Sequence, residues 1–531
     1  MDLSITFKHI ACLSMSEEDM QKCSQLFSSH YGTWGDDPAC PERKGKNIKM
    51  SPDLFRRRFL KPNRYIIMAF DNTKLIGHVV YLKTSVPRKY KKNTISWILQ
   101  IVVDKGYRGK EIGIRMMTAI WGMSDYAWGL YTAHPLTIAT LEKATLRRVI
   151  PTQLTNERLE ELKLVAADLF ENMEWIQHYH DGKVKTEFYI SHEKIAEQIK
   201  KSYRSRVFPF SPLDPGEEWL AFVFDKQPLI EDAYKHIRKR IQFDMERLKR
   251  AYANMKMKEQ KWANCADIEM EYLVKKGYIT PQSRILDLGC GTGRHGKALQ
   301  KYDTYYKGID FIENRIKEAK DENLSNQTLS FELADAREYY EKKPYDTILS
   351  LYDVIGSFPI DRDNHKIIST AYRNLRRGGY FVLSVMNLGT TMQRCRQKFP
   401  KHIVYDIEKH VKSLLDLEPS TAMQDTGEIF NPRHLIIDQK TGIIYRKEQF
   451  TPIDQLPSEL FIQDKRYTAQ TITKSLLRHG FSIIDLKYVN AGQWEKTQKA
   501  RSATSSKEIL VIAQKPSIIG SFFNYCKSFL I

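Results

Sequence analysis

One short stretch of the sequence decides the fold: ILDLGCGTGRH at residues 285–295. Its first four residues read as a buried strand, because they are apolar apart from one aspartate and a turn follows them. Gly289, Gly291 and Gly293 then predict a tight turn, since glycine tolerates positive φ angles and lets other groups approach the backbone. The stretch therefore predicts a strand, a glycine-rich turn and the start of a helix, which open a doubly wound α/β sheet.

Further strands follow this unit. The second ends at Asp310, the third ends at Asp335 and Ala336, and the next two cover residues 345–351 and 380–385. Helical segments separate them, and this alternation predicts a parallel, doubly wound sheet. A carboxylate that ends the second strand can accept hydrogen bonds from both hydroxyls of a ribose, and the one after the third strand suits the amino group of an adenine.

The order of these motifs resembles the class I methyltransferases that use S-adenosylmethionine (SAM), over about residues 245–515. A nicotinamide-binding Rossmann domain is the rival reading, but its G-x-G-x-x-G fingerprint places the third glycine differently. The resemblance implies SAM as cofactor, with Asp287 and the three glycines in contact with its methionine moiety. It also implies contacts of Asp310 with the ribose, and of Asp335 and Ala336 with the adenine.

The segment YDVIGSF at residues 352–358 follows the fourth strand and is expected to face the methyl acceptor. It lacks the Asp/Asn-Pro-Pro-Tyr pattern of many DNA methyltransferases and looks more like small-molecule N-methyltransferases. Tyr352 and Asp353 are therefore candidate catalytic residues, able to orient or deprotonate an amine. In the alternative reading, Tyr352 packs in the pocket wall and Asp353 caps a helix. An insertion at about residues 390–465 is expected to form a lid over the acceptor.

A second motif lies near the N-terminus, where residues 65–70, 75–82 and 98–103 read as strands. The following segment, VDKGYRGKEIGIRMM at residues 103–117, opens a helix and resembles the pyrophosphate loop of GCN5-related N-acetyltransferases (GNAT). The resemblance covers about residues 1–150 and implies a mixed sheet with helices that binds acetyl-coenzyme A (acetyl-CoA). The implied contact residues are Ile101, Val103, Arg108, Gly109, Lys110, Ile112 and Gly113.

The chemistry of this loop suits a diphosphate. Backbone N–H groups at a helix start bind phosphate, and Arg108, Lys110 and Arg115 add positive charge. Two features depart from the family pattern. Glu111 replaces a glycine, and its carboxylate could repel phosphate or point outward. The next helix lacks the tyrosine that often acts as general acid, so Tyr131 is the candidate in its place.

Composition bounds the remaining expectations. A chain of 531 residues exceeds one ordinary core, and we expect domains at residues 1–231 and 232–531. A helix is expected at about residues 156–177, and the apolar tail at 517–531 could pack on its own domain or dock elsewhere.

The formal net charge of +19 suits RNA, an anionic membrane or CoA, but also a merely solvated surface.

The seven cysteines include no C-x-x-C pair, which argues against a disulfide scaffold or a zinc ribbon and favours a reducing compartment. No metal site is expected. The first residues lack the pattern of a signal peptide, and no apolar run is long enough to cross a bilayer. The expected location is therefore the cytoplasm.

These observations predict a bifunctional transferase. A SAM-dependent methyltransferase, acting on an amine of a small molecule, would be fused to an acetyl-CoA-dependent N-acetyltransferase. One alternative is an RNA- or tRNA-modifying methyltransferase, which the charge favours but no RNA-binding motif supports. Another is a methyltransferase joined to a non-catalytic, acetyltransferase-like recognition module.

Overall fold

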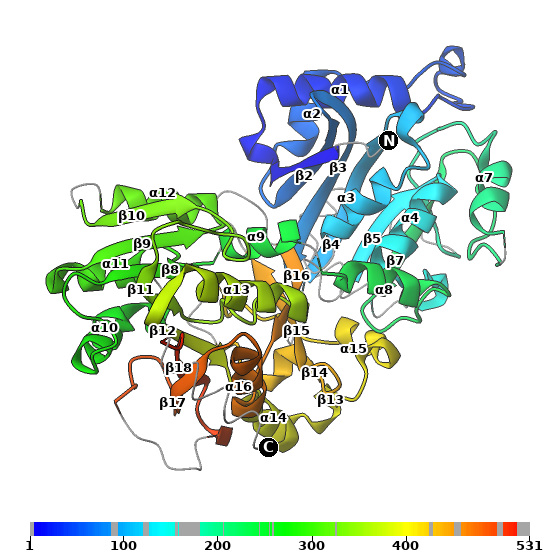
Figure 1. Cartoon of the computed structure of the whole chain (residues 1–531). Coiled ribbons are helices and arrows are strands. Elements are labelled where there is room, and N and C mark those ends of the chain that lie inside the picture. Colours follow the sequence, from blue (N-terminus) through cyan, green and yellow to red (C-terminus); the bar gives the residue numbers. More distant parts are fainter. Residues whose placement is uncertain are drawn as a thin grey trace. The chain divides into compact units, whose positions relative to one another are not determined.

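The chain divides into two compact units in a computed structural model (Figure 1). The N-terminal unit comprises Met1–Ile237 with Thr451–Glu459, and the C-terminal unit comprises Arg238–Phe450 with Leu460–Ile531. The structure describes residues 5–85, 94–120, 127–153, 158, 181–204, 206–243, 245–253, 255–257, 260–323, 327–423, 428–450, 458–495 and 503–517. The expected helix at 156–177, apart from residue 158, and the tail from residue 518 onward lie outside these ranges.

The N-terminal unit is built on a sheet of order β1-β2-β3-β4-β5-β7-β6. Its strands are β1 (Ile5–Ala11), β2 (Arg64–Asp71), β3 (Lys74–Ser85), β4 (Thr94–Val103), β5 (Ala127–Thr132), β6 (Lys183–Lys185) and β7 (Glu217–Phe224). Its helices include α1 (Glu17–His30), α2 (Pro52–Phe59), α3 (Ile112–Ile120), α4 (Pro135–Thr145) and α7 (Ile195–Ser202). Strands β4 and β5 are parallel, and the other neighbouring pairs are antiparallel.

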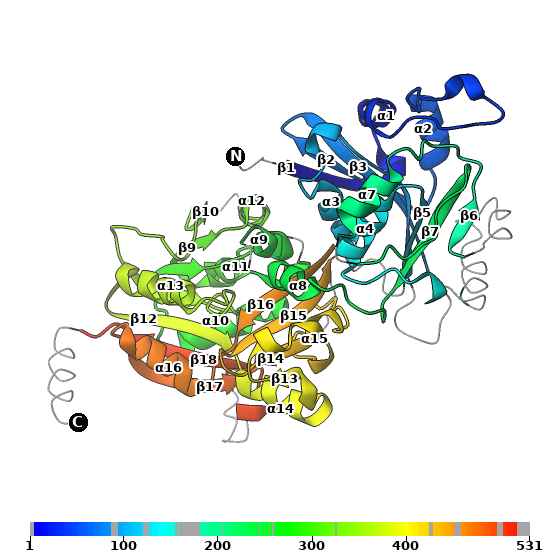
Figure 2. The same cartoon turned by 90° about the vertical axis from the view of Figure 1, so that its right-hand side faces the viewer.

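Both faces of this sheet are covered by helices, as Figure 2 shows. In β2, Ile67 and Ala69 pack with the buried residues of α3 and α4, whereas Ile66 and Met68 pack with those of α1 and α2. This alternation follows from the two-residue period of a strand, which sends successive side chains to opposite faces. Strand β2, which the apolar run predicts, therefore lies inside the sheet and is covered by helices on both faces.

A cleft opens where β4 and β5 part. The two strands pair only over Ile95–Trp97 and Ala127–Gly129, and no later residues of them pair. On its other side β4 carries a bulge at Leu99, because Ile98 and Gln100 pair with consecutive residues of β3. Since a bulge bends and twists its strand, it directs the end of β4 away from β5.

The C-terminal unit contains a sheet of order β10-β9-β8-β11-β12-β18-β17. Its strands are β8 (Arg284–Leu288), β9 (Tyr305–Asp310), β10 (Leu329–Leu333), β11 (Tyr345–Ser350), β12 (Leu375–Met386), β17 (Ser482–Val489) and β18 (Glu508–Gln514). Strands β8 to β12 are parallel, as the alternating pattern predicts. Strand β18 instead runs antiparallel to both of its neighbours. The sheet is therefore mixed, whereas the alternating pattern predicted parallel strands throughout.

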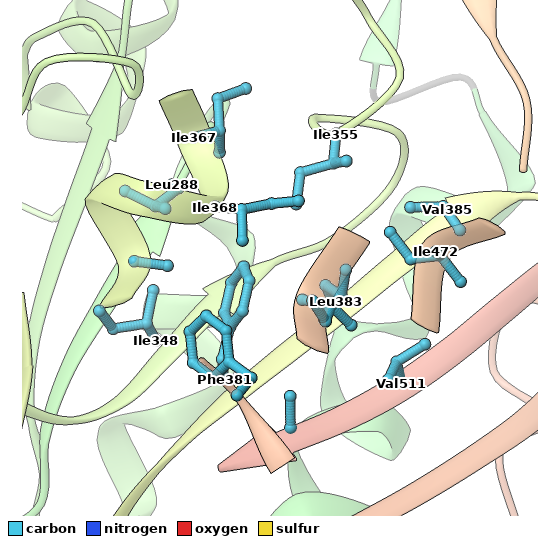
Figure 3. Close-up of a cluster of buried hydrophobic side chains, with 14 of the residues drawn as sticks. Leu288, Ile348, Ile355, Ile367, Ile368, Phe381, Leu383, Val385, Ile472 and Val511 are labelled. Carbon is cyan, nitrogen blue, oxygen red and sulfur yellow. The ribbon is translucent and has the colours of Figure 1, made fainter. Parts of the chain in front are cut away.

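Helices cover both faces of this second sheet. They are α9 (Met245–Ala253), α10 (Ala266–Lys275), α11 (Arg294–Leu299), α12 (Glu313–Asp321), α13 (Asp361–Asn374) and α16 (Ala469–Arg478). Figure 3 shows one buried cluster, in which Phe381 and Leu383 of β12 lie near Ile368 of α13 and Ile472 of α16. Buried residues of α10, α11 and α12 pack on the opposite face. These layers hold the carboxyl ends of the parallel strands in fixed register.

The segment between β12 and α16 forms a smaller sheet of order β13-β14-β15-β16. Its elements are α14 (Leu388–Lys398), β13 (Ile403–Val404), α15 (Val411–Leu415), β14 (Leu435–Asp438), β15 (Ile443–Phe450) and β16 (Ser458–Lys465). The backbone N–H of Lys465 donates to the carbonyl of Gly356 at 2.7 Å. The end of β16 is thus joined to the segment that follows β11.

Candidate functional site

The glycine-rich turn after β8 needs glycine at each of its three glycine positions. Their φ angles are +76°, +56° and +78°, a region that other residues rarely adopt. A Cβ atom on Gly289 would lie 2.5 Å from Cγ2 of Val354, and one on Gly291 would lie 2.8 Å from Cε of Met257. The turn is therefore closely enclosed by the segment after β11 and by the segment before α10.

Asp310 stands at the end of β9, directly beside this turn. Its Oδ2 accepts a hydrogen bond from Gly291 N–H, and its Oδ1 accepts one from Ile312 N–H, both at 2.9 Å. Burial raises the pKa of this carboxyl above its usual value. Each oxygen keeps a further lone pair, so Asp310 can still accept hydrogen bonds from two hydroxyls of a ligand.

Asp287 has a different environment. Its Oδ2 accepts a hydrogen bond from the Tyr306 hydroxyl at 2.7 Å and lies 2.9 Å from Nδ1 of His295. The residue is 1% exposed. These bonds tie β8 to β9 and to the start of α11, so Asp287 braces the glycine turn. The contact with methionine remains a prediction.

Asp335, expected at the adenine, is already engaged by its own turn. Both its oxygens accept hydrogen bonds from the Arg337 guanidinium, the shortest at 2.6 Å. Burial acts to raise the pKa of Asp335, but these bonds outweigh it and the pKa is lowered. Ala336 packs against the adjoining core. An adenine amino group would therefore share Asp335 with Arg337.

The turn after β11 holds the two candidate catalytic residues in a strained conformation. Tyr352 and Asp353 have φ angles of +62° and +68°. Tyr352 N–H donates to Ser384 Oγ at 2.9 Å, its hydroxyl donates to Glu269, and its ring stacks on Trp262 at 4.8 Å between centroids. A left-handed backbone conformation costs a non-glycine residue about 1–2 kcal/mol. Residues strained in this way are often found at functional sites.

The Asp353 carboxyl is buried among charged residues of the inserted sheet. Its Oδ1 has no hydrogen-bond partner among the described residues, and Oδ1 of Asp464 is in the same state. Arg466 Nε donates to Asp464 Oδ2 at 2.9 Å, and an Arg446 nitrogen lies 3.6 Å from Oδ1. Burial and then Asp464 raise the pKa of Asp353 well above its usual range, against the two arginines. The insertion thus supplies the charges around Asp353, a contribution the motif alone did not reveal.

In the N-terminal unit, a cavity of about 470 Å³ fills the cleft between β4 and β5. Its walls also include the start of α3 and one side of α4. The predicted residues among those that line it are Ile101, Val103, Arg108, Gly109, Ile112, Gly113 and Tyr131. Lys110 belongs to the predicted set but not to the described lining.

Two basic side chains of the loop contact other groups of the protein. Arg108 Nε donates to the Val103 carbonyl at 3.1 Å, and another guanidinium nitrogen donates to the His30 carbonyl. The Lys110 ammonium lies over the Tyr107 ring, 4.8 Å from its centroid. The loop therefore offers a diphosphate mainly its backbone N–H groups and less side-chain charge than its composition suggested.

Glu111 adopts the left-handed conformation that its position requires, with a φ angle of +60°. Gly109, two residues earlier, has a φ angle of +81°. Glu111 also lies among the residues that line the cavity. The departure from the glycine pattern thus introduces both strain and a negative charge at the loop.

Comparison with known proteins identifies two domains in the chain. A methyltransferase domain model matches residues 279–440, and an acetyltransferase (GNAT) family model matches residues 31–124. The chain joins a methyltransferase domain to a GNAT domain. No curated protein matches the chain.

The solved structures to which the chain is similar include three methyltransferases. The CcbJ methyltransferase of Streptomyces caelestis is 10% identical, with 48% of this chain and 90% of that chain covered and a TM-score of 0.35. A SAM-dependent methyltransferase of Clostridium acetobutylicum is 13% identical, with 51% and 99% covered and a TM-score of 0.35. One from Methanosarcina mazei is 17% identical, with 46% and 97% covered and a TM-score of 0.32.

The GNAT domain brings a further carboxyl to its cleft that the sequence analysis missed. Glu218 of β7 lines the cavity with Tyr131 and accepts hydrogen bonds from the Thr186 hydroxyl, at 2.8 Å, and from Ala133 N–H. Burial raises the pKa of Glu218 to about 7. Burial and the Glu218 charge raise the pKa of Tyr131 to about 12. The available signal was a pair of glutamates, Glu217 and Glu218, at the start of an otherwise apolar strand.

Across the ranges that the structure describes, we find no helix with the length and apolarity needed to span a bilayer.

Proposed function

We propose that the methyltransferase domain methylates an amine nitrogen of a small molecule and that the GNAT domain acetylates an amine with acetyl-CoA. The observation that carries the first half is the strained turn after β11. In this turn, the buried Oδ1 of Asp353 has no hydrogen-bond partner among the described residues. The next residue, Val354, packs on Gly289 of the glycine turn. A polar group in this position favours a ligand that donates hydrogen bonds, as an amine does.

The residues at the carboxyl edge of the second sheet fit SAM. The glycine turn leaves no room for side chains, and Asp310 beside it retains acceptor capacity on both oxygens. When bound, SAM supplies an electrophilic methyl group on a sulfonium. The domain's own part is to hold both reactants and exclude water, which can account for much of such a rate enhancement.

Asp353 has the properties of a group that handles the proton of the amine. A neutral amine must present its lone pair, and methylation moves the positive charge of the sulfonium to the nitrogen, which then has one proton to release. The carboxyl can take that proton only in its ionised form, and since burial and Asp464 raise its pKa, it ionises at a higher pH than an exposed aspartate does. The adjacent Tyr352 ring, stacked on Trp262, forms a flat wall beside it.

In the GNAT domain the corresponding group is Glu218. A carboxyl with a pKa of about 7 is half ionised near neutral pH and can accept the proton that an attacking amine loses. Tyr131 keeps its phenolic proton at that pH and can donate a hydrogen bond inside the cleft. Both side chains face the same cavity.

The test uses a cell metabolite extract incubated with the full chain, deuterated-methyl SAM and ¹³C-labelled acetyl-CoA. Mass spectrometry should detect small molecules that gain the labelled methyl or acetyl group at nitrogen. Asp353→Asn should abolish the methylated product and leave the acetylated one, and Glu218→Gln should do the reverse, so each variant controls for the other. Methyl label found only in the RNA fraction, or at oxygen or carbon, would contradict the proposal.

A further inference from the structure

Two carboxylate oxygens at the methyltransferase site have no hydrogen-bond partner among the described residues. They are Oδ1 of Asp353, in the turn after β11, and Oδ1 of Asp464, near the end of β16. The two residues are 8% and 3% exposed, so protein encloses both carboxyls. A buried acceptor without a donor costs free energy, and most buried polar groups in proteins are hydrogen-bonded. Each oxygen therefore indicates a place for a group that donates a hydrogen bond.

The end of β16 lies against the turn that carries Asp353. Lys465, the residue after Asp464, donates its backbone N–H to the Gly356 carbonyl at 2.7 Å. A Cβ atom on Gly356 would collide with both Asp353 Oδ1 and the Lys465 carbonyl oxygen. After burial, the charge of Asp464 is the largest cause that raises the pKa of Asp353. Burial and then Asp353 raise the pKa of Tyr252 in α9, and Asp464 acts in the same direction. The two carboxyls therefore belong to one site.

The arginines of the inserted sheet are bound to other acceptors. Arg466 Nε donates to Asp464 Oδ2 at 2.9 Å, and its other two nitrogens donate to groups of the same insertion at 2.7 and 3.0 Å. Arg446 Nε donates to Glu448, and another Arg446 nitrogen lies 3.6 Å from Asp464 Oδ1, beyond hydrogen-bond distance. Arg466 thus fixes which oxygen of Asp464 is paired, and Oδ1 keeps its capacity to accept.

We propose that Asp353 Oδ1 and Asp464 Oδ1 accept the two N–H groups of a primary amine, so that the methyltransferase domain takes primary amines and adds one methyl group. This inference rests on the proposed methylation of an amine. A neutral primary amine has two N–H donors and one lone pair. Two carboxylate oxygens can therefore hold the nitrogen while its lone pair stays free to attack.

The same geometry explains why transfer should stop after one methyl group. In the attack the N–C bond forms, the C–S bond breaks with its electron pair left on sulfur, and the nitrogen then releases one proton. The resulting secondary amine has a single N–H. It can satisfy only one of the two oxygens and leaves the other buried without a donor, so it should be a poorer acceptor than the primary amine.

The first test counts methyl groups. The full chain is incubated with a cell metabolite extract and deuterated-methyl SAM, and mass spectrometry should find one labelled methyl group on each methylated nitrogen. The purified product, returned to fresh enzyme and SAM, should react at least about tenfold more slowly than the acceptor did, because one charge-assisted hydrogen bond is lost. Two labelled methyl groups on one nitrogen, or equal rates for acceptor and product, would overturn the inference.

Asp464→Asn tests the second oxygen. Because Arg466 Nε needs an acceptor, the amide oxygen should take the place of Oδ2 and the amide NH2 that of Oδ1, where it cannot accept from an amine. The KM for the acceptor isolated from the extract should rise at least about tenfold, while SAM affinity measured by calorimetry should stay within about twofold.

Asp438→Asn is the matched control. Asp438 of β14 lies in the same sheet and is also 3% exposed, and its Oδ1 accepts a hydrogen bond from Lys440 N–H at 3.0 Å, which an amide oxygen can accept as well. This variant should keep the wild-type KM.

The outcomes separate this inference from the function beneath it. An unchanged KM in Asp464→Asn overturns the two-carboxylate site and leaves amine methylation standing. Absence of any N-methylated small molecule, from a chain that binds SAM, overturns the proposed methylation and this inference with it. Circular dichroism on each variant establishes that it is folded.

Discussion

Three non-glycine residues at the two candidate sites adopt left-handed backbone conformations: Glu111, Tyr352 and Asp353. Each costs about 1–2 kcal/mol, which the surrounding packing must offset. At the methyltransferase turn, the strained segment packs on the glycine loop through Val354, and the Tyr352 ring stacks on Trp262. At the GNAT loop, the residue that bears the strain is a carboxylate facing a cavity that we expect to hold phosphate. At Glu111, the backbone strain and the repulsion between its carboxylate and a phosphate therefore both disfavour a glutamate.

Glu111→Gly should therefore tighten acetyl-CoA binding, because it removes a negative charge and leaves a residue that favours a φ of +60°. Calorimetry measures the affinity. Glu187→Gly is the matched control, since Glu187 has a φ of +55° in the same unit but is not among the described cavity-lining residues. Both variants should gain up to about 1 kcal/mol in stability, but only the first should change affinity. An equal affinity in Glu111→Gly and the wild type would rule out a role for this carboxylate.

Asp310→Ala should weaken SAM binding at least roughly tenfold, since hydrogen bonds to a charged group contribute about 1.5–3 kcal/mol. The exposed Asp321 at the end of α12 supplies a control, and Asp321→Ala should bind SAM as the wild type does. Calorimetric titration of both variants gives the comparison. Unchanged SAM affinity in Asp310→Ala would remove Asp310 from the site.

Acetyl transfer should depend on pH through Glu218. Burial raises its pKa to about 7, and only the ionised carboxylate can accept a proton. The rate should therefore be low at pH 5.5–6, rise through pH 7 and level off above about pH 8. Glu218→Gln should remove this limb and lower the plateau. Rates from pH 5.5 to 9 test this, and an identical limb in the variant would assign the titration to another group.

At the scale of elements, the sequence predicted what local patterns determine. Strand periodicity located β2, β3, β4 and β8, and the glycine spacing located the turn after β8. Features that depend on pairing between distant segments could not be foreseen. The parting of β4 from β5 follows from the bulge at Leu99, and Glu218 reaches the cleft because β7 pairs with β5. Likewise, only folding brings Arg446 and Asp464 to Asp353.

Glu142 of α4 accepts hydrogen bonds from Arg206 at 2.5 Å and from the Tyr203 hydroxyl at 3.2 Å, and this tether between α4 and the segment after α7 gives a prediction at this scale. Glu142→Ala should destabilise the chain by about 1.5–3 kcal/mol, because it removes charge-assisted hydrogen bonds to Arg206 and leaves that guanidinium, 18% exposed, without this carboxylate. Urea unfolding measures the loss. Glu197→Ala, on the exposed side of α7, should change stability by less than about 0.5 kcal/mol. Equal stability of the two variants would show that the tether does not hold α7.

At the scale of the whole molecule, the chain combines two units with separate buried cores, each with its own candidate cofactor site. A unit whose strands bury both faces internally can fold without its neighbour. The net charge of +19 accords with an anionic ligand such as CoA. The central claim is therefore that one chain binds two different group donors at two independent sites.

Calorimetric titration of the full chain with SAM, and then of the SAM-saturated chain with acetyl-CoA, tests this claim most directly. We predict one molecule of each cofactor per chain, with Asp310→Ala weakening only SAM binding and Glu111→Gly tightening only acetyl-CoA binding. Heat from SAM alone, with no acetyl-CoA binding at millimolar concentration even in Glu111→Gly, would contradict the two-donor account and leave the GNAT domain without its proposed activity.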